Sequence, residues 1–223
     1  MLRACEQRGC IVLPTTSQAE LFSSKSYVAL RQFQPFMLPT TIVNLQSVSS
    51  LPAGYILKST YRSGGLCQLR YGHVIDQYKV VQSQLGIQDV IMQSWCPAFR
   101  VRPEVRVFMN YTKVLCLCGT LCTSGKVYAE THLESFYTNR QIRVFREFAT
   151  LIMQILLELP QFRGQTSLGI FRVDCIVDDK GRILLNEIED MGNIFMFPEI
   201  YDPCNDIIVN LASEVLANMS VLK

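Results

Sequence analysis

The stretch FRVDCIVDDKGRILLNEIEDMG, residues 171–192, decides the fold prediction for this chain. It predicts two apolar strands joined at Asp-Lys-Gly, residues 179–181, because such a tripeptide between two apolar runs favours a hairpin turn. Asp174, Glu187 and Glu189 interrupt the apolar pattern of these strands. Ionised carboxylates are rarely buried without a partner, since removing them from water is costly. The carboxylates therefore either face solvent or surround a positive group.

The composition predicts a folded protein and selects no ligand. The chain has 223 residues, of which 49% are hydrophobic and 18% charged, so it can bury a core as one large domain or as two small lobes. Its formal net charge of +2 and its pI near 8.1 are too mild to indicate a nucleic acid or an anionic membrane as partner.

The nine cysteines favour a reduced, cytoplasmic setting, since most of them lie in apolar strand-like runs where a thiol packs as a small hydrophobic group. Cys116, Cys118 and Cys122 lack the CxxC spacing of a structural zinc site, and His73 and His132 lack ligand-like spacing. The N-terminus has no long apolar segment, and the most apolar run, from Phe148, is too short to span a bilayer. We therefore expect no signal peptide and no membrane association.

The element pattern predicts an α+β chain with an antiparallel sheet. A capping box at Ser17 to Glu20 predicts a helix over residues 21–33. Strands are predicted at 40–48, 54–60, 89–95, 104–110, 113–122, 126–131, 168–178 and 182–190. Helices are predicted at 74–86, with Gly86 as its C-cap, at 142–159, closed by Pro160, and at 206–219.

Lys58 and the glycines that follow it are the first candidate for phosphate binding. Lys58 lies within an otherwise apolar strand, where the plainer interpretation is a solvated lysine on the strand face. Gly64 and Gly65 follow closely, and glycine backbone lets N–H groups approach phosphate oxygens. The pattern is not GxxxxGK[ST], so a P-loop or Rossmann-type nucleotide site is not indicated.

Taken in order, these motifs resemble the ATP-grasp superfamily. YILKSTYRSGG is similar to the strand-borne lysine and glycine loop of that family, and VIMQSW is similar to its hinge strand. PEVRVFMNYTKVLCLCG resembles its Glu-x-Arg strand pair, and residues 171–192 resemble its closing metal-ligand hairpin. The resemblance covers about residues 35–217 and rests on the order and spacing of the motifs.

The resemblance implies an ATP site between two α+β lobes, with Lys58 and Arg106 as catalytic residues. Lys58 would contact the α- or β-phosphate, Arg106 the γ-phosphate or an acyl phosphate, and Glu104 would orient Arg106. The nucleotide contacts implied by the resemblance also include a lid of Ser63, Gly64 and Gly65, a hinge of Gln93, Ser94, Trp95 and Cys96 whose backbone reads adenine, and Ile56 and Leu185 around the ring.

For Asp174, Glu187 and Glu189 the resemblance implies Mg²⁺ binding. Mg²⁺ prefers carboxylates together with phosphate oxygens and water, and the two strands of a hairpin bring Asp174 and Glu187 to cross-strand distance. The family pattern on the second strand is Glu-x-Asn, whereas this chain has Glu187-Ile188-Glu189. The change keeps an oxygen ligand and adds a negative charge. The plainer alternative for both glutamates is an exposed strand face.

The predicted domains are a short N-terminal α/β segment at 1–50, a small lobe with the lysine and glycine loop at 51–90, and a large lobe with the metal-ligand hairpin at 91–223. Since only about 45 residues precede the lysine strand, the fold class is an ATP-grasp-like α+β fold with a truncated N-terminal lobe. The acceptor pocket would then be reduced, absent or supplied by another subunit.

Four functions remain open from the sequence. The first is a Mg-ATP-dependent ligase that phosphorylates a carboxylate to an acyl phosphate, with an unknown acceptor. The second is a non-ligating factor that binds a protein partner, similar to the cell-division-cycle assembly branch of the superfamily. A ligase of nucleic-acid ends ranks lower, because KSTYR does not match the KxDG motif of nucleotidyltransferases. The fourth keeps the fold without nucleotide binding.

Overall fold

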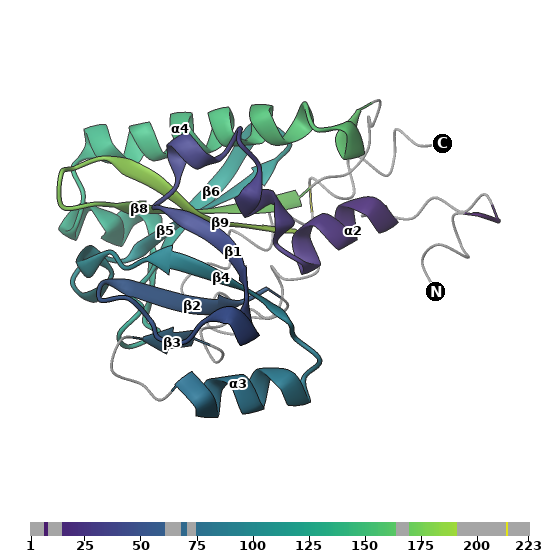
Figure 1. Ribbon diagram of the computed structural model, residues 1–223. Coiled ribbons are helices and arrows are strands. Elements are labelled where there is room, and N and C mark those ends of the chain that lie inside the picture. The colour runs from purple at the N-terminus through teal and green to yellow at the C-terminus, as the bar shows by residue number, and fades with distance from the viewer. Residues whose placement is uncertain are drawn as a thin grey trace. The chain divides into compact units, whose positions relative to one another are not determined.

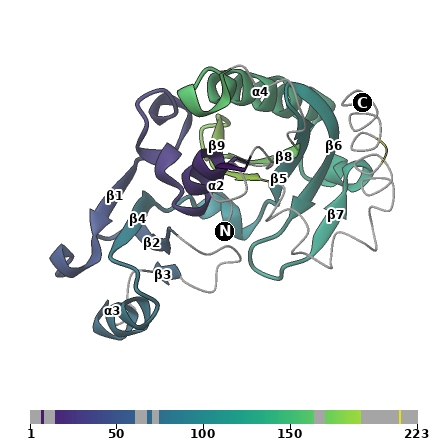
Figure 2. The same cartoon turned by 90° about the vertical axis from the view of Figure 1, so that its right-hand side faces the viewer.

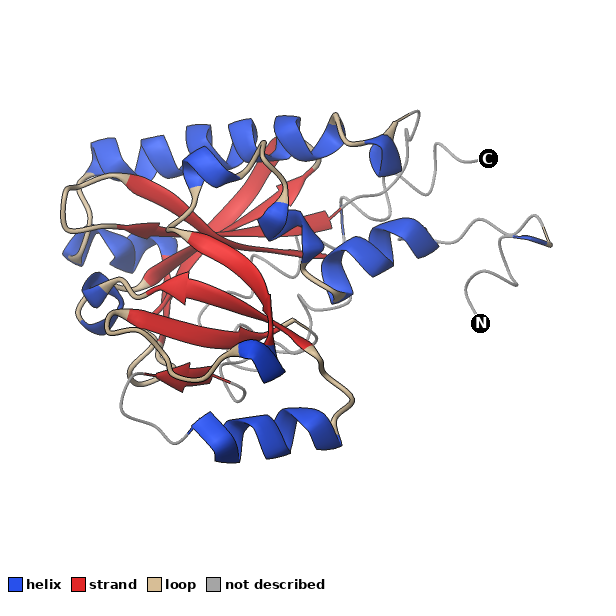
Figure 3. Cartoon of the chain, in the orientation of Figure 1, coloured by secondary structure: helices blue, strands red, loops and turns tan. Residues whose placement is uncertain are grey.

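The computed structural model describes residues 7–8, 15–60, 68–70, 75–163, 170–190 and 213. The chain divides into two compact units, residues 20–96 and residues 1–19 with 97–223. The strands, red in Figure 3, form two sheets, one of four strands and one of five. The predicted domain boundaries after residues 50 and 90 both fall inside the unit 20–96, in which the strands Thr40–Asn44 and Asp89–Ser94 pair in one sheet.

The unit 20–96 contains an antiparallel sheet in the order β1-β4-β2-β3. Its elements are β1 Thr40–Asn44, β2 Tyr55–Ser59, β3 Gln68–Arg70, α3 Ile75–Gln84 and β4 Asp89–Ser94 (Figure 1). The core of this unit joins α3 to one face of the sheet and contains Leu45, Val48, Leu57, Tyr78, Ile87 and Val90. The predicted helix at 74–86 is thus confirmed, and Gly86 takes the left-handed conformation, φ +70°, that its C-cap role requires.

The predicted helix over residues 21–33 is wrong. Helix α2 spans Thr16–Ser23 and the chain leaves it at Lys25, which has a φ of 50°. The capping box is formed by Thr15 and Gln18, which exchange side-chain to backbone hydrogen bonds of 3.4 Å and 3.0 Å, and not by Ser17 and Glu20. The Ser24 hydroxyl donates to the Glu20 carbonyl, a local bond that competes with helix continuation.

The second unit contains a five-stranded antiparallel sheet in the order β7-β6-β5-β8-β9. Its elements are β5 Glu104–Asn110, β6 Lys113–Thr120, β7 Val127–Ala129, α4 Asn139–Leu157, β8 Ile170–Val177 and β9 Ile183–Asp190. The long helix α4 lies along this sheet in both views, Figures 1 and 2, and contacts β5, β6 and β8. The predicted strand pairs and the hairpin are confirmed, and the hairpin turn includes Gly181 at φ 77°.

The predicted apolar face of α4 is confirmed, since Phe145, Ala149, Ile152, Met153 and Leu156 are buried. Thr138 and Gln141 form a capping box at its start. Alternate residues of β5 and β8 are fully buried on one face of the sheet, among them Val105, Val107, Met109 and Val173. We infer that α4 covers this apolar face, because burying both apolar surfaces together removes the most area from water.

The opposite face of the five-stranded sheet carries both apolar and charged residues. At one end Phe108, Cys118 and Ile170 form an apolar cluster. The remainder of this face carries the charged residues of the hairpin and of β5. The predicted helix at 206–219 lies, apart from residue 213, outside the described residues. No helix among the described residues is long and apolar enough to cross a membrane.

Candidate functional site

In the unit 20–96, Lys58 and Ile56 lie on the sheet face that α3 does not cover. Leu57 is part of the core beneath α3, and successive strand residues point to opposite faces. Ile56 is directly opposite Gln93, and Lys58 is directly opposite Ile91. Residues paired in this way in an antiparallel sheet share a face. Three of the predicted nucleotide contacts, Ile56, Lys58 and Gln93, therefore lie on one surface of this unit.

The hinge residues after Gln93 already use two of their backbone donors. The N–H of Ser94 donates to the carbonyl of Pro39 at 2.9 Å, and the N–H of Trp95 donates to the carbonyl of Gly54 at 2.7 Å. These two N–H groups are therefore not available to adenine, whereas the carbonyl oxygens of the same residues keep acceptor capacity, so the predicted reading of adenine by the hinge backbone stays a prediction. Cys96, the fourth hinge residue, is buried. The predicted lid residues Ser63, Gly64 and Gly65 lie outside the described residues.

In the second unit, the predicted arginine and carboxylates share one face of three neighbouring strands. Arg106 on β5 is opposite Asp174 on β8, and Asp174 is opposite Glu187 on β9. Two residues away along β8, Arg172 is opposite Glu189. With Glu104, the charged face defined by these residues holds four carboxylates and two guanidinium groups.

Arg172 and Asp174 form a buried bidentate ion pair. Arg172 Nε donates to Asp174 Oδ1 at 2.7 Å and Arg172 Nη2 donates to Oδ2 at 2.8 Å, and the two side chains are 2% and 1% exposed. Burial alone would lower the pKa of Arg172, but the charges of Asp174, Glu189 and Glu104 outweigh it and raise that pKa. Arg172 therefore stays charged and partly neutralises the carboxylates around it.

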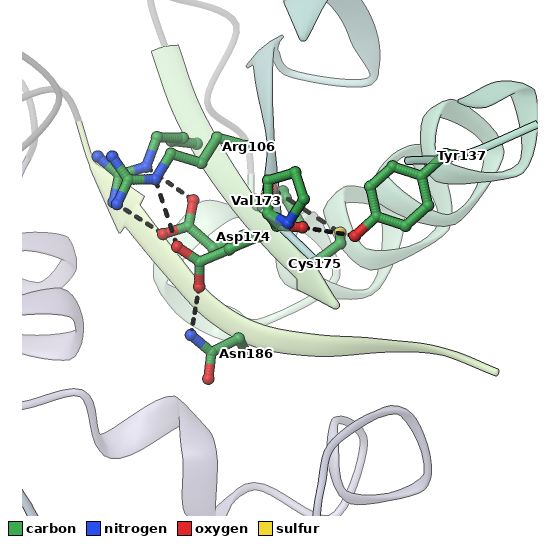
Figure 4. A network of polar contacts seen from close by, with 9 residues as sticks. Arg106, Tyr137, Val173, Asp174, Cys175 and Asn186 are labelled. Atoms are coloured by element: carbon green, nitrogen blue, oxygen red, sulfur yellow. Dashed lines mark hydrogen bonds and ion pairs between the residues drawn. The ribbon is translucent and has the colours of Figure 1, made fainter. Parts of the chain in front are cut away.

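Glu104 joins Arg106 to Asn186. Its Oε2 accepts from Arg106 Nε at 3.3 Å, and its Oε1 accepts from Asn186 Nδ2 (Figure 4). Burial, followed by the charge of Asp174, raises the pKa of Glu104, while Arg106, Arg172 and the Asn186 hydrogen bond oppose that rise. The Glu104–Arg106 contact expected from the Glu-x-Arg pattern is thus present in the structure.

A β-bulge in β9 explains how Asn186 reaches Glu104 and corrects the role expected for Leu185. The register shifts between Asp174, opposite Glu187, and Cys175, opposite Leu185, so Asn186 is an extra residue in β9. Leu185 consequently lies with Cys175 and Val105 on the apolar face, and it is fully buried there. Leu185 therefore lies on the opposite side of the sheet from the charged residues, and we no longer expect it to contact adenine.

The carboxylates fit Mg²⁺ in chemistry and register, but they are not assembled into a complete ligand set. Asp174 and Glu187 are cross-strand neighbours with oxygen donors of the kind Mg²⁺ prefers. Both oxygens of Asp174 accept from Arg172, and among the described residues no group of three acidic, histidine or cysteine side chains has the geometry to hold a metal ion. Phosphate oxygens and water would have to complete the coordination, as is usual for this ion.

Two residues of the site, Arg172 on the charged face and Asn186 beside Glu104, were not predicted from the sequence. Arg172 could have been found, because period-two alternation places it on the same face as Asp174. Asn186 could not have been found. Strict alternation would place Asn186 on the other face of the sheet from Glu187, and only the bulge turns it toward Glu104.

The architecture matches solved structures along most of the chain. The crystal structure of D-cycloserine synthetase DcsG matches with a TM-score of 0.58 and 14% identity, over 97% of this chain and 77% of that one. D-alanyl-alanine synthetase A from Vibrio cholerae matches with a TM-score of 0.58 and 15% identity, over 97% and 72%. A RimK domain ATP-grasp protein from Sphaerobacter thermophilus matches with a TM-score of 0.59 and 11% identity, over 94% and 72%. The chain has an ATP-grasp fold.

The ATP-grasp fold confirms the fold class predicted from residues 171–192 and the motifs before them. An ADP complex of N5-carboxyaminoimidazole ribonucleotide synthetase, at 17% identity and a TM-score of 0.56, shows that a protein of this fold binds nucleotide. No protein-family model matches the chain, and no curated protein matches it in sequence. Identities this low establish the fold, so the roles of individual residues depend on the geometry described above.

Proposed function

We propose that the chain is a Mg-ATP-dependent ligase that transfers the γ-phosphoryl group of ATP to a carboxylate, which gives ADP and an acyl phosphate, and then transfers the acyl group to a nucleophile with release of phosphate. The observation that carries this proposal is the charged face of β5, β8 and β9, in which two buried arginines lie among four carboxylates within an ATP-grasp fold. Phosphoryl transfer needs positive groups that stabilise charge on the equatorial phosphate oxygens.

Each group of residues has a distinct part in this proposal. Lys58 contacts the α- or β-phosphate, and Ile56 packs against the base. Arg106, held by Glu104, contacts the γ-phosphate and the acyl phosphate. Arg172 remains charged beside Asp174 and offsets the negative charge of the carboxylates. Asp174, Glu187 and Glu189 would hold Mg²⁺, which when bound neutralises charge on the phosphates.

Nucleotide binding can be tested by thermal denaturation with and without Mg-ATP. A ligand that binds only the native state, present at about 100 times its Kd, stabilises the fold by about 2.7 kcal/mol. Lys58→Ala and Glu187→Gln should each remove most of the shift. Lys79→Ala is the matched control, because Lys79 lies on α3, which covers the other face of the sheet. If wild-type protein shows no shift at millimolar Mg-ATP, nucleotide binding is contradicted.

Turnover needs a separate measurement, because binding alone does not establish ligation. We would incubate the protein with Mg-ATP, a panel of carboxylates and a panel of amines, and measure release of ADP and phosphate. Release that depends on one carboxylate, and that Arg106→Met abolishes, supports the ligase. Measurable ATP binding without ADP release from any combination would contradict it.

A second candidate, a non-ligating nucleotide-binding factor for a protein partner, is favoured by a different observation. Both oxygens of Asp174 are engaged by Arg172, and Glu189 stands where the family pattern has asparagine. An Asp174 carboxylate whose two oxygens are already engaged by an arginine is less available to a catalytic metal ion, which suits binding better than turnover. Stoichiometric retention of a purified partner in the presence of ATP, without ADP release, would distinguish this candidate from the ligase.

A further inference from the structure

Tyr137 holds the chain at the point where β5 begins. Its hydroxyl donates a hydrogen bond to the carbonyl oxygen of Pro103, and Pro103 directly precedes Glu104, the first residue of β5 (Figure 4). Tyr137 lies between the 3₁₀ helix Glu130–Ser135 and α4, 34 residues further along the chain than Pro103. A long-range hydrogen bond therefore fixes the backbone next to a residue of the charged face.

The Tyr137 side chain has the rigidity and the protonation state that a fixed donor needs. It is 3% exposed, and its ring packs edge-on against Phe145 of α4, with centroids 5.1 Å apart and an interplanar angle of 80°. Burial raises the pKa of Tyr137 above its ordinary value, so the phenol keeps its proton and donates at neutral pH. Because α4 fixes the ring, it also fixes the hydroxyl.

Pro103 has little freedom to move away from this donor. Proline has a fixed φ and no backbone N–H, so its carbonyl oxygen is the one hydrogen-bonding group that it offers. The Pro103 ring also packs closely on Gly119 of β6. A Cβ added at Gly119 would lie 3.0 Å from Pro103 Cβ and 2.5 Å from Leu133 Cδ2. Tyr137 and Gly119 thus both restrict the position of Pro103.

Glu104 carries the effect of this contact to the other face of the sheet. Val105 is buried on the apolar face, and alternation places Glu104 and Arg106 on the charged face. The distance from Arg106 Nε to Glu104 Oε2 is 3.3 Å, slightly beyond the usual range of N–H···O hydrogen bonds. A small displacement of the Glu104 backbone would break this contact, so the geometry of Arg106 depends on where β5 begins.

We propose that Tyr137 is a positioning residue for Arg106. Through Pro103 it fixes Glu104, and Glu104 orients the guanidinium group that the proposed function assigns to the γ-phosphate and the acyl phosphate. This inference rests on the proposed function and adds a residue that contacts neither ATP nor a metal ion. Tyr137→Phe removes the hydroxyl and keeps the ring against Phe145, so the variant should fold.

The first test measures nucleotide binding calorimetrically. Loss of one hydrogen bond of ordinary strength should weaken ATP binding to Tyr137→Phe about fivefold, and AMP binding should stay nearly unchanged because AMP lacks the γ-phosphate. Tyr137→4-aminophenylalanine restores an N–H donor in place of the hydroxyl and should recover the ATP affinity. Tyr128→Phe is the matched control, since it removes a hydroxyl from a ring that packs edge-on against Phe136, with centroids 5.0 Å apart, and it should change neither affinity.

The second test observes Arg106 in the absence of nucleotide, by NMR of isotope-labelled protein. The Nε–H signal of Arg106 is identified as the signal that Arg106→Met removes. In Tyr137→Phe this signal should shift, and its exchange with solvent should become about fivefold faster, because its hydrogen bond to Glu104 is weakened. Tyr128→Phe should leave the signal unchanged.

The results separate this inference from the proposed function. If wild-type protein binds no ATP, the proposed function fails, and the Arg106 signal alone decides whether Tyr137 positions that residue. If Tyr137→Phe weakens ATP and AMP equally, or if 4-aminophenylalanine does not restore ATP affinity, Tyr137 supports the fold in general and the inference is overturned. An Arg106 signal that is the same in Tyr137→Phe and wild-type protein overturns it as well.

Discussion

Arg172 and Asp174, two residues apart on β8, bind each other through both carboxylate oxygens at 2.7 Å and 2.8 Å in a setting that is almost wholly buried. Residues two apart on a strand share a face, so the pair needs no distant element to form. The pair explains how carboxylates can interrupt the apolar strands of residues 171–192, because Arg172 supplies a positive group beside them. It also shows that Asp174 has a structural partner before any metal ion binds.

Breaking this pair from one side should be more harmful than removing it. Asp174→Asn leaves the buried Arg172 without its bidentate carboxylate partner, with only the charges of Glu189 and Glu104 acting on it, and we expect a loss of about 3–5 kcal/mol in the free energy of unfolding. The double variant Asp174→Asn with Arg172→Met removes both charges and should recover part of that loss. Urea denaturation of the two variants and of wild-type protein measures this. A double variant less stable than Asp174→Asn would contradict the interpretation.

Asp178 gives a prediction for pH dependence. Burial would raise its pKa, but hydrogen bonds from the backbone and side chain of Arg182 and from the backbone of Lys180 outweigh that effect and lower it. A carboxyl whose pKa is lower in the folded protein stabilises it above the pKa of the unfolded chain, and this stability is lost as pH falls through the folded pKa.

Asp178→Asn should therefore be less stable than wild-type protein at pH 7, by about 1–2 kcal/mol. The difference should shrink as pH falls below the ordinary aspartate value, 3.8. Asp179→Asn is the matched control, because Asp179 is an exposed neighbour in the same turn, and it should change little at either pH. Urea midpoints at both pH values provide the measurement. A difference that is constant with pH would show that charge is not the cause.

The sequence predicted those parts of the fold that local patterns control. The strands at 104–110 and 182–190 and the helix carrying Phe145 and Ile152 follow from alternation and helical spacing. The helix expected over 21–33 failed because Phe22, Tyr27 and Phe33 pack into one aromatic cluster, with ring centroids 6.1 Å and 6.0 Å apart. Burial of that cluster outweighs helix propensity.

The candidate site was predictable to a similar extent. The charges of β5, β8 and β9 share a face because alternation is local, and Arg172 could have been added by the same reasoning. The positions of Leu185 and Asn186 depend on a bulge, which follows from how β9 pairs with β8 and not from either strand alone. The orientation of the Gln93 amide depends on Thr40, which is 53 residues away in the sequence.

Gln82 on α3 should be a site where substitution stabilises the protein. Its side chain is fully buried next to the apolar core of the unit 20–96, and neither amide atom has a hydrogen-bond partner among the residues that the structure describes. Burying an unpaired amide costs about 1–3 kcal/mol, so Gln82→Met should raise the free energy of unfolding by about 1–2 kcal/mol. Gln84→Met, on the exposed side of α3, should have little effect. Thermal and urea denaturation measure both, and a destabilised Gln82→Met would indicate a hidden polar partner.

Asn186 should be coupled to Glu104 and, through it, to Arg106. Asn186→Leu removes the donor to Glu104 Oε1 and leaves a buried carboxylate oxygen without that hydrogen bond, so we expect a loss of about 1–3 kcal/mol in the free energy of unfolding. The same substitution in a Glu104→Gln background should have a smaller effect, because no charge is then left unpaired.

The coupling energy from this double-mutant cycle should be about 1 kcal/mol or more, since the two side chains are in direct contact. Under the proposed function, Asn186→Leu should also weaken ATP binding severalfold while leaving AMP binding nearly unchanged, because Arg106 is assigned to the γ-phosphate, which AMP lacks. Equal weakening of ATP and AMP would show that Asn186 supports the fold in general and does not position Arg106.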